Sequence, residues 1–135
     1  MFLSALPSRA ASRVIAWGYN YQGQTNVPLD LTNAVAISAS YGHSRALRAD
    51  GTVTNWGKFL YSDNHQGPIY VPADVTNITA IAAGYSHDLA LTADGAVRAW
   101  GFFATYGETN VPPQVTNVVA IATKNRHDLA LRTGG

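Results

Sequence analysis

The sequence predicts an all-β protein built from β-propeller blades, and three observations lead to that prediction. Four short motifs recur in the same order three times along the 135 residues, at a repeat of about 40–44 residues, which suits a propeller blade. Apolar and polar residues alternate in runs such as "DLAL" at 88–91, the pattern of a half-buried strand. No stretch has a convincing helical period.

The four motifs are Val-Pro, Thr-Asn, a histidine and Trp-Gly, and the distances between them are informative. The proline and the histidine are 15 residues apart in every copy, and the histidine and the next tryptophan are 13 apart in both complete copies. Only the segment from tryptophan to proline varies, at 11, 16 and 12 residues. This pattern indicates a fixed packing frame with one variable surface loop per repeat.

Each repeat is expected to contain the same elements in the same order. We expect residues 1–12 to be an N-terminal extension or a degenerate strand, followed by three repeats over about 13–51, 52–95 and 96–135. A repeat begins with a strand that ends in tryptophan, such as 14–17, and continues through the variable loop to a possible fourth strand near "TNVP". An apolar strand such as 118–122 then pairs with the histidine strand, and an Asp-Gly pair predicts a tight hairpin turn.

Strand direction predicts which loops share an edge. The loop before each histidine and the variable loop should lie at one edge, and the Asp-Gly turns at the other. The first edge is rich in aromatic residues, which dominate protein-binding hot spots together with arginine. An alternative is that several of these rings pack between blades. The candidate partner-binding rim comprises Tyr19, Tyr21, Tyr41, Phe59, Tyr61, His65, Tyr85, Phe102, Phe103, Tyr106 and Arg126.

The recurring histidines are expected to be structural. His43, His87 and His127 occur once per blade, so they should radiate around a ring instead of converging on a metal ion. We expect them to cap backbone groups within their own blades. Neighbouring strand residues point to opposite faces, so His87 and Asp88 should not form a dyad.

The recurring tryptophans are also expected to be structural. Trp17, Trp56 and Trp100 each end a strand, which favours packing between blades over a role as stacking platforms for sugars. The glycine that follows each tryptophan should permit the turn after it.

The composition argues against several functional classes. Only 13% of residues are charged and the net charge is +1, which disfavours a nucleic-acid groove. The chain has no cysteine, so disulfides and cysteine-based metal sites are excluded. The apolar start over 1–10 is too short for a membrane span and makes a poor signal peptide. We expect no enzyme activity, catalytic residue, metal, cofactor, nucleic-acid partner or membrane partner.

The motif "IAAGYSHDLAL" at 81–91 resembles the repeat of the regulator of chromosome condensation 1 family. The fuller pattern, with "VIAWGYNYQGQTNVP" at 14–28, is closer to the short-blade bacterial type to which the beta-lactamase inhibitor protein II belongs. The resemblance implies a propeller that binds other proteins through loops on one face, and it favours a secreted or extracytoplasmic location. The copies diverge, since Ser40 and Lys124 replace Gly84, and Arg45 replaces the leucine of the other copies.

Three repeats are fewer than a closed propeller requires. The chain contributes a tryptophan strand before its first complete blade and a histidine strand without a following tryptophan strand. We therefore expect a homodimer in which two copies complete the terminal blades in trans and close a six-bladed ring. A nine-bladed ring, an open stack and a fragment of a longer protein are alternatives.

The function expected from these features is that of a non-enzymatic, self-assembling scaffold that binds a protein partner through the aromatic rim. One alternative is a lectin-like propeller in which the rings stack on sugars. Another is a purely structural or engineered assembly module that has no ligand.

Overall fold

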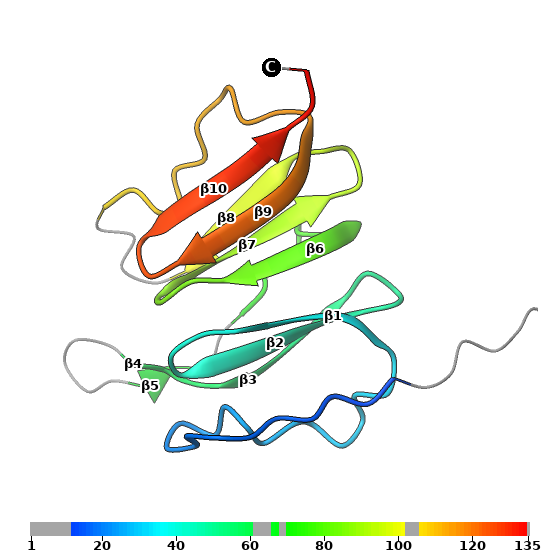
Figure 1. The fold of residues 1–135 in the computed structure, drawn as a ribbon, viewed down its shortest axis with the longest axis vertical. Helices are drawn as coiled ribbons and strands as arrows, with labels where there is room; N and C mark the ends of the chain where they lie inside the picture. The colour runs from blue at the N-terminus through cyan, green and yellow to red at the C-terminus, as the bar shows by residue number, and fades with distance from the viewer. Residues whose placement is uncertain (1–11, 61–65, 68–69, 102–105, 135) are drawn as a thin grey trace, which may run out of the picture.

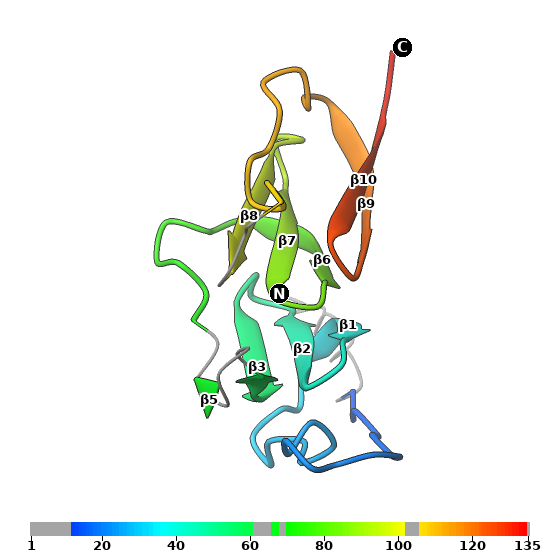
Figure 2. The same ribbon diagram turned by 90° about the vertical axis from the view of Figure 1, so that its left-hand side faces the viewer.

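The computed structural model describes residues 12–60, 66–67, 70–101 and 106–134. Three antiparallel blade sheets follow one another along the molecule (Figures 1 and 2). The described strands are β1 (Ala34–Ala39), β2 (His43–Arg48), β3 (Val53–Gly57), β4 (Phe59–Leu60), β5 (Gln66–Gly67), β6 (Ile78–Ala83), β7 (His87–Thr92), β8 (Val97–Gly101), β9 (Val118–Lys124) and β10 (His127–Arg132).

The sheets confirm the prediction of an all-β fold made of propeller blades. Blade 1 has the strand order β1-β2-β3, blade 2 has β6-β7-β8, and blade 3 has the pair β9-β10. The short β4 and β5 pair with each other. The sheets of blades 1 and 2 extend past residues 51 and 95, so each sheet takes its third strand from the start of the next sequence repeat.

The Asp-Gly pairs form the predicted hairpin turns. Gly51 and Gly95 have φ angles of +83° and +79°, the left-handed region that such turns require. Asp94 accepts a hydrogen bond of 2.6 Å from the Thr92 hydroxyl, and this bond holds the pKa of Asp94 below its ordinary value. Asp50 accepts an equivalent bond from Thr52, with the same effect on its pKa.

The hydrophobic core lies between the blades. On one face of blade 2, Ala90 and Trp100 pack against Leu47 of blade 1. On the other face, Leu89 packs against Val118 of blade 3. This arrangement follows from the alternation of side chains along β7, which gives each blade two apolar faces.

Two predicted strands are absent from the described residues. No strand forms near "TNVP" at 25–28 or 109–112, where prolines remove ladder donors and backbone bonds such as Leu31 N to the Pro28 carbonyl close tight turns instead. Residues 13–18 are also outside any strand. Ser12, just before them, forms an isolated parallel bridge with Asn33. Of the predicted extension over 1–12, residues 1–11 lie outside the described residues.

The glycine at the end of β3 is held in a crowded position. Gly57 has a φ of +86°, and a Cβ there would lie 2.8 Å from the His43 Cα, besides contacting the Gly42 carbonyl oxygen. We expect Gly57→Ala to lower the free energy of unfolding by about 2–4 kcal/mol, through backbone strain and overpacking together. Urea denaturation of both proteins measures the loss.

Gly51→Ala is the matched control. Gly51 has a similar φ of +83°, but the nearest atom to its Cβ would be the Ile78 nitrogen at 3.9 Å. Its loss should be about 1 kcal/mol, from backbone strain alone. Equal losses in the two variants would contradict the packing described for β3.

Candidate partner-binding rim and the contacts that position it

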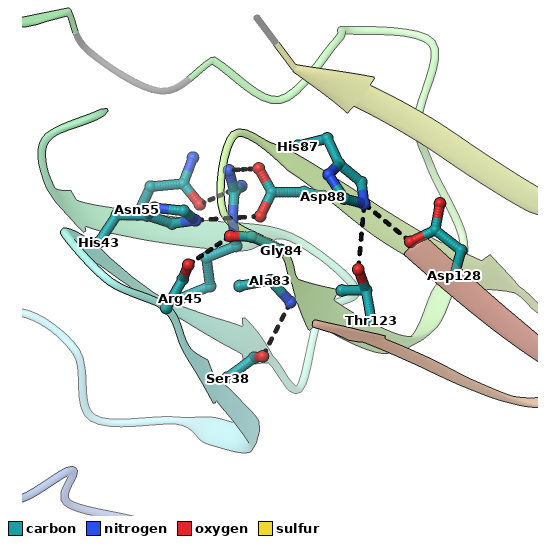
Figure 3. A network of polar contacts seen from close by, with 11 residues as sticks. Ser38, His43, Arg45, Asn55, Ala83, Gly84, His87, Asp88, Thr123 and Asp128 are labelled. Atoms are coloured by element: carbon teal, nitrogen blue, oxygen red, sulfur yellow. Dashed lines mark hydrogen bonds and ion pairs between the residues drawn. The ribbon is translucent and has the colours of Figure 1, made fainter. Parts of the chain in front are cut away.

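A buried polar cluster joins blade 1 to blade 2 (Figure 3). His43 on β2 and Asp88 on β7 are fully buried, and the Nε2 atom of His43 lies 3.2 Å from Oδ1 of Asp88. The other carboxylate oxygen of Asp88 pairs with the guanidinium of Arg45, which also donates a 2.8 Å hydrogen bond to the Asn55 side chain. The same guanidinium lies 5.4 Å from the centre of the Trp100 ring. One carboxylate therefore holds two basic side chains of the preceding blade.

Burial of Arg45 has an electrostatic cost that Asp88 offsets. Desolvation lowers the pKa of Arg45, while the charge of Asp88 and its hydrogen bond act in the opposite direction. Sequence reasoning identified Arg45 only as a divergent residue and missed this pair. The sequence did contain a signal for this pair. Arg45 occupies a position that is leucine in the other copies, and Asp88 of the next copy occupies the position of Ser44.

The contact between histidine and aspartate repeats one blade further along. The Nε2 atom of His87 lies 2.7 Å from Oδ1 of Asp128 on β10 and 3.0 Å from the hydroxyl of Thr123 on β9. The histidines thus bind the next blade, whereas capping within their own blade was expected. His87 and Asp88 do point to opposite faces, which is why each serves a different interface. His127 is exposed, because no described blade covers it.

Direct bonds between neighbouring loops fix the edge that precedes the histidines. The Ser40 hydroxyl donates to the Gly84 carbonyl, joining the β1–β2 loop to the β6–β7 loop. The Tyr85 amide donates a 3.0 Å bond to the Asn125 carbonyl in the β9–β10 loop. Figure 1 shows these three loops at one edge of the molecule and the Asp-Gly turns at the opposite edge.

Five tyrosines of the candidate rim are exposed, and the structure brings four of them together in two pairs. The rings of Tyr41 and Tyr85, from adjacent blades, are 5.6 Å apart between centroids. Those of Tyr19 and Tyr21 are stacked at 6.4 Å. Tyr106 instead contacts Arg126, whose guanidinium carbon lies 4.9 Å from the ring centre.

The remaining rim candidates are not placed by the structure. Phe59 lies on β4, and only its backbone is described. Tyr61, His65, Phe102 and Phe103 lie outside the described residues.

The tryptophans differ between copies. Trp56 and Trp100 are buried in the clusters between and within blades, and the indole of Trp56 donates a 2.8 Å bond to the Gln24 carbonyl. Trp17 is exposed on the segment that precedes blade 1.

No group of three or more His, Cys, Asp or Glu side chains that could hold a metal ion occurs among the described residues. Within the same residues there is also no helix long and apolar enough to cross a membrane. The features that the structure does offer are the exposed tyrosines, the inter-blade polar pairs and an uncovered sheet edge.

Comparisons with known proteins place these features in a propeller of known type. Residues 78–107 match the Regulator of chromosome condensation (RCC1) repeat. A search of curated proteins finds no match. The match covers one repeat of the chain, and the three sheets have the arrangement of propeller blades.

Solved structures with a similar fold include proteins from plants and yeast. The ectodomain of the receptor kinase CR4 from Physcomitrella patens aligns at a TM-score of 0.65 and 22% identity over 88% of this chain and 33% of that one. The ectodomain of the Arabidopsis thaliana receptor kinase ACR4 gives 0.63 and 23%, over 87% and 44%. Prp20p from Saccharomyces cerevisiae gives 0.61 and 20%, over 84% and 38%. The chain thus spans a third to under half of each of these proteins.

The polar cluster predicts a specific pattern of stability losses. Asp88→Ala should lower the free energy of unfolding by about 3–5 kcal/mol, because it leaves the charge of Arg45 buried without a counter-charge. Asp50→Ala, in an exposed turn, should cost about 1 kcal/mol or less. Chemical denaturation gives both values.

A double variant separates the charge from the packing. Arg45→Leu with Asp88→Ser installs the residues found at the equivalent positions of the neighbouring copies, Leu89 and Ser44. Because it removes both charges together, it should recover at least half of the loss caused by Asp88→Ala. A double variant as unstable as the sum of the two single variants would contradict the pairing.

Proposed function

We propose that this chain is a non-enzymatic propeller scaffold that assembles with itself and binds a protein partner through its aromatic rim. The observation that carries the proposal is the row of exposed tyrosines along one edge of adjacent blades. Exposed aromatic rings gathered at one edge are the residue type that dominates protein-binding hot spots.

The setting of Tyr41 and Tyr85 supports this function. Their loops are tied to each other and to the β9–β10 loop by the hydrogen bonds of Ser40 and Tyr85. Rings held in place before binding lose little conformational entropy when a partner covers them. These bonds support a pre-organised surface at Tyr41 and Tyr85, and Arg126 adds one positive charge beside Tyr106.

Structural neighbours support a protein as the partner class. The yeast structures are described as Prp20p with its binding properties to Gsp1p and histones, and as yeast RCC1 (Prp20) bound to Kap60. We extend to this chain only the class of partner, a protein. From the sequence resemblance to the short-blade bacterial type, and not from these neighbours, we also propose an inhibitor-like mode of binding.

The self-assembly part of the proposal rests on apolar surface that the described residues leave exposed, such as Leu129 and Leu131 of β10. Blade 3 has two strands where blades 1 and 2 have three, and the apolar side chains of β10 are exposed. Residues 14–18 have the same sequence pattern as the third strands β3 and β8, beginning with valine and ending in Trp-Gly. Two copies would close a six-bladed ring by a pair of equivalent joints.

The rim predicts a loss of partner binding on removal of its rings. Proteins captured from lysate by the immobilised chain are purified and titrated by calorimetry against the wild type and the double variant Tyr41→Ala/Tyr85→Ala. Each ring should contribute about 1–3 kcal/mol, so the affinity should fall at least about tenfold. Leu29→Ala is the control, because Leu29 is fully exposed and apolar but lies outside the rim loops.

Two results would contradict the rim. One is a partner that binds the double variant as tightly as the wild type. The other is binding confined to sugars on a glycan array, which would favour the lectin-like alternative.

Self-assembly predicts the mass in solution. Sedimentation equilibrium at micromolar concentration should give twice the mass of one chain, falling toward that of one chain on dilution. A well-folded monomer at every concentration would contradict self-assembly. It would say nothing about partner binding through the rim, which the calorimetry tests separately.

A further inference from the structure

The segment before blade 1 has the sequence pattern of an outer strand but forms no strand and pairs with no hairpin among the described residues. Its sequence, Val14 to Gly18, repeats that of β3 and β8, including the final Trp-Gly. Val14 packs against the core of blade 1, while Ile15 and Trp17 are 63% and 84% exposed. Trp56 and Trp100, at the equivalent places of complete blades, are each 9% exposed. The alternation is that of a strand, yet no hairpin pairs with it among the described residues.

Blade 3, in contrast, has the hairpin β9–β10 but no third strand among the described residues. In blade 2 the outer-strand Trp100 fills the space over Ala90 and against Leu47 of the preceding blade. The equivalent space in blade 3 is a cavity of about 350 Å³, lined by Leu89, Val97, Val111, Val115 and Ala130 among others. The indole that would fill it is missing, although the apolar walls are in place.

A second and larger cavity lies between the orphan segment and blade 1. It has a volume of about 1010 Å³ and is lined on one side by residues 14–17 and on the other by Ile37 of β1 and Trp56 of β3. In a complete propeller this is the place of a two-stranded hairpin. The hairpin β9–β10 offers a matching apolar face, with Leu129 65% exposed where Leu89 of blade 2 is 2% exposed.

Gly18 gives an independent indication of what is missing. It has a φ of +101°, in the left-handed region also used by Gly57 and Gly101. A Cβ at those two glycines would lie 2.8 Å and 2.5 Å from the Cα of the histidine in the adjoining strand. A Cβ at Gly18 would meet nothing within 4 Å. Gly18 therefore holds the conformation that a histidine hairpin requires, without the hairpin.

We propose that residues 14–18 of one copy pair antiparallel with β10 of a second copy, and that Trp17 fills the cavity over Ala130. This inference rests on the self-assembly proposed above and specifies its joint. A second copy is the occupant because each chain carries both halves, so one two-fold operation fills both cavities in both copies. The register is the one shared by β2–β3 and β7–β8. It places Gly18 opposite His127, Trp17 opposite Asp128, Ala16 opposite Leu129, Ile15 opposite Ala130 and Val14 opposite Leu131.

The joint between copies differs chemically from the joints inside the chain. Inside the chain, His43 and His87 each face an aspartate of the next blade. The equivalent position opposite His127 is Ser44 of the second copy, whose hydroxyl donates to the Gln24 carbonyl at 2.8 Å. The joint in trans therefore buries apolar surface without the aspartate that accompanies it elsewhere.

Cysteine cross-linking tests the register, since the chain has no cysteine of its own. The full chain is made with Ala16→Cys and Leu129→Cys, and in a second protein with Ile15→Cys and Ala130→Cys. Both pairs lie opposite each other in the proposed ladder, within the range that a disulfide can span. Mild oxidation should give a covalent dimer on a non-reducing gel that dithiothreitol reverses.

The control pair is Ala16→Cys with Ala130→Cys, whose side chains would point to opposite faces of the joined sheet. It should cross-link several-fold less than the matched pairs. Preferential cross-linking of the control pair would indicate a ladder shifted by one residue and would overturn the proposed register.

Gly18→Ala tests the joint, because in the single chain the added methyl group meets no atom within 4 Å and brings only the backbone strain of a positive φ. The extra methyl group should clash with the second copy's hairpin, so the dissociation constant should rise at least about tenfold, as for an overpacked contact. Gly23→Ala, at a φ of +80° with only the Asn26 side chain nearby, is the matched control. Circular dichroism checks that both variants fold.

The outcomes separate the joint from the assembly. A dimer by sedimentation that neither cross-links in the matched pairs nor weakens in Gly18→Ala would overturn this joint and leave self-assembly intact. A monomer at all concentrations would overturn both.

Discussion

The contact between a histidine of one blade and an aspartate of the next is the interaction on which the rest of this structure depends. His43 meets Asp88, and His87 meets Asp128, at the same place in successive sheets. Because adjacent strand residues point to opposite faces, each histidine strand can face the following blade with one residue and the preceding blade with the other. The buried polar pair links successive sheets at a fixed place, and the guanidinium of Arg45 is a second partner of Asp88 at the first joint.

Alignment of the blades has two consequences for function. The loops before the histidines come to one edge, where hydrogen bonds link them and bring the rings of Tyr41 and Tyr85 together. The same stacking leaves apolar side chains exposed at both ends of the described blades, Leu129 in blade 3 and Trp17 in the segment before blade 1. The proposed protein-binding rim and the proposed self-assembly are thus both argued from one packing arrangement.

Much of this could be predicted from local sequence. The hairpins and their Asp-Gly turns follow from period-two alternation and glycine at positive φ, and the repeat spacing predicted propeller blades. The aspartate partners of the histidines could not be predicted from local sequence, because each histidine and its aspartate are more than forty residues apart in the chain and meet only when the sheets pack. The burial of Arg45 depends on Asp88 in the next blade, so the leucine at its position in the other copies indicates a buried site but does not identify the counter-charge. Residues 14–17 have the composition of a strand, but a strand requires a partner, and none pairs with them among the described residues.

The central claim is that a blade is stable only when neighbours cover both of its faces, and amide hydrogen exchange tests it most directly. Exchange across β7 and β10 is followed by mass spectrometry at a high and a low concentration of the protein. The account predicts that β7, covered on both faces, stays protected at both concentrations, whereas β10 is protected at the high concentration and exchanges quickly on dilution. Equal protection of β10 and β7 at the low concentration, or rapid exchange of β10 at both, would contradict it.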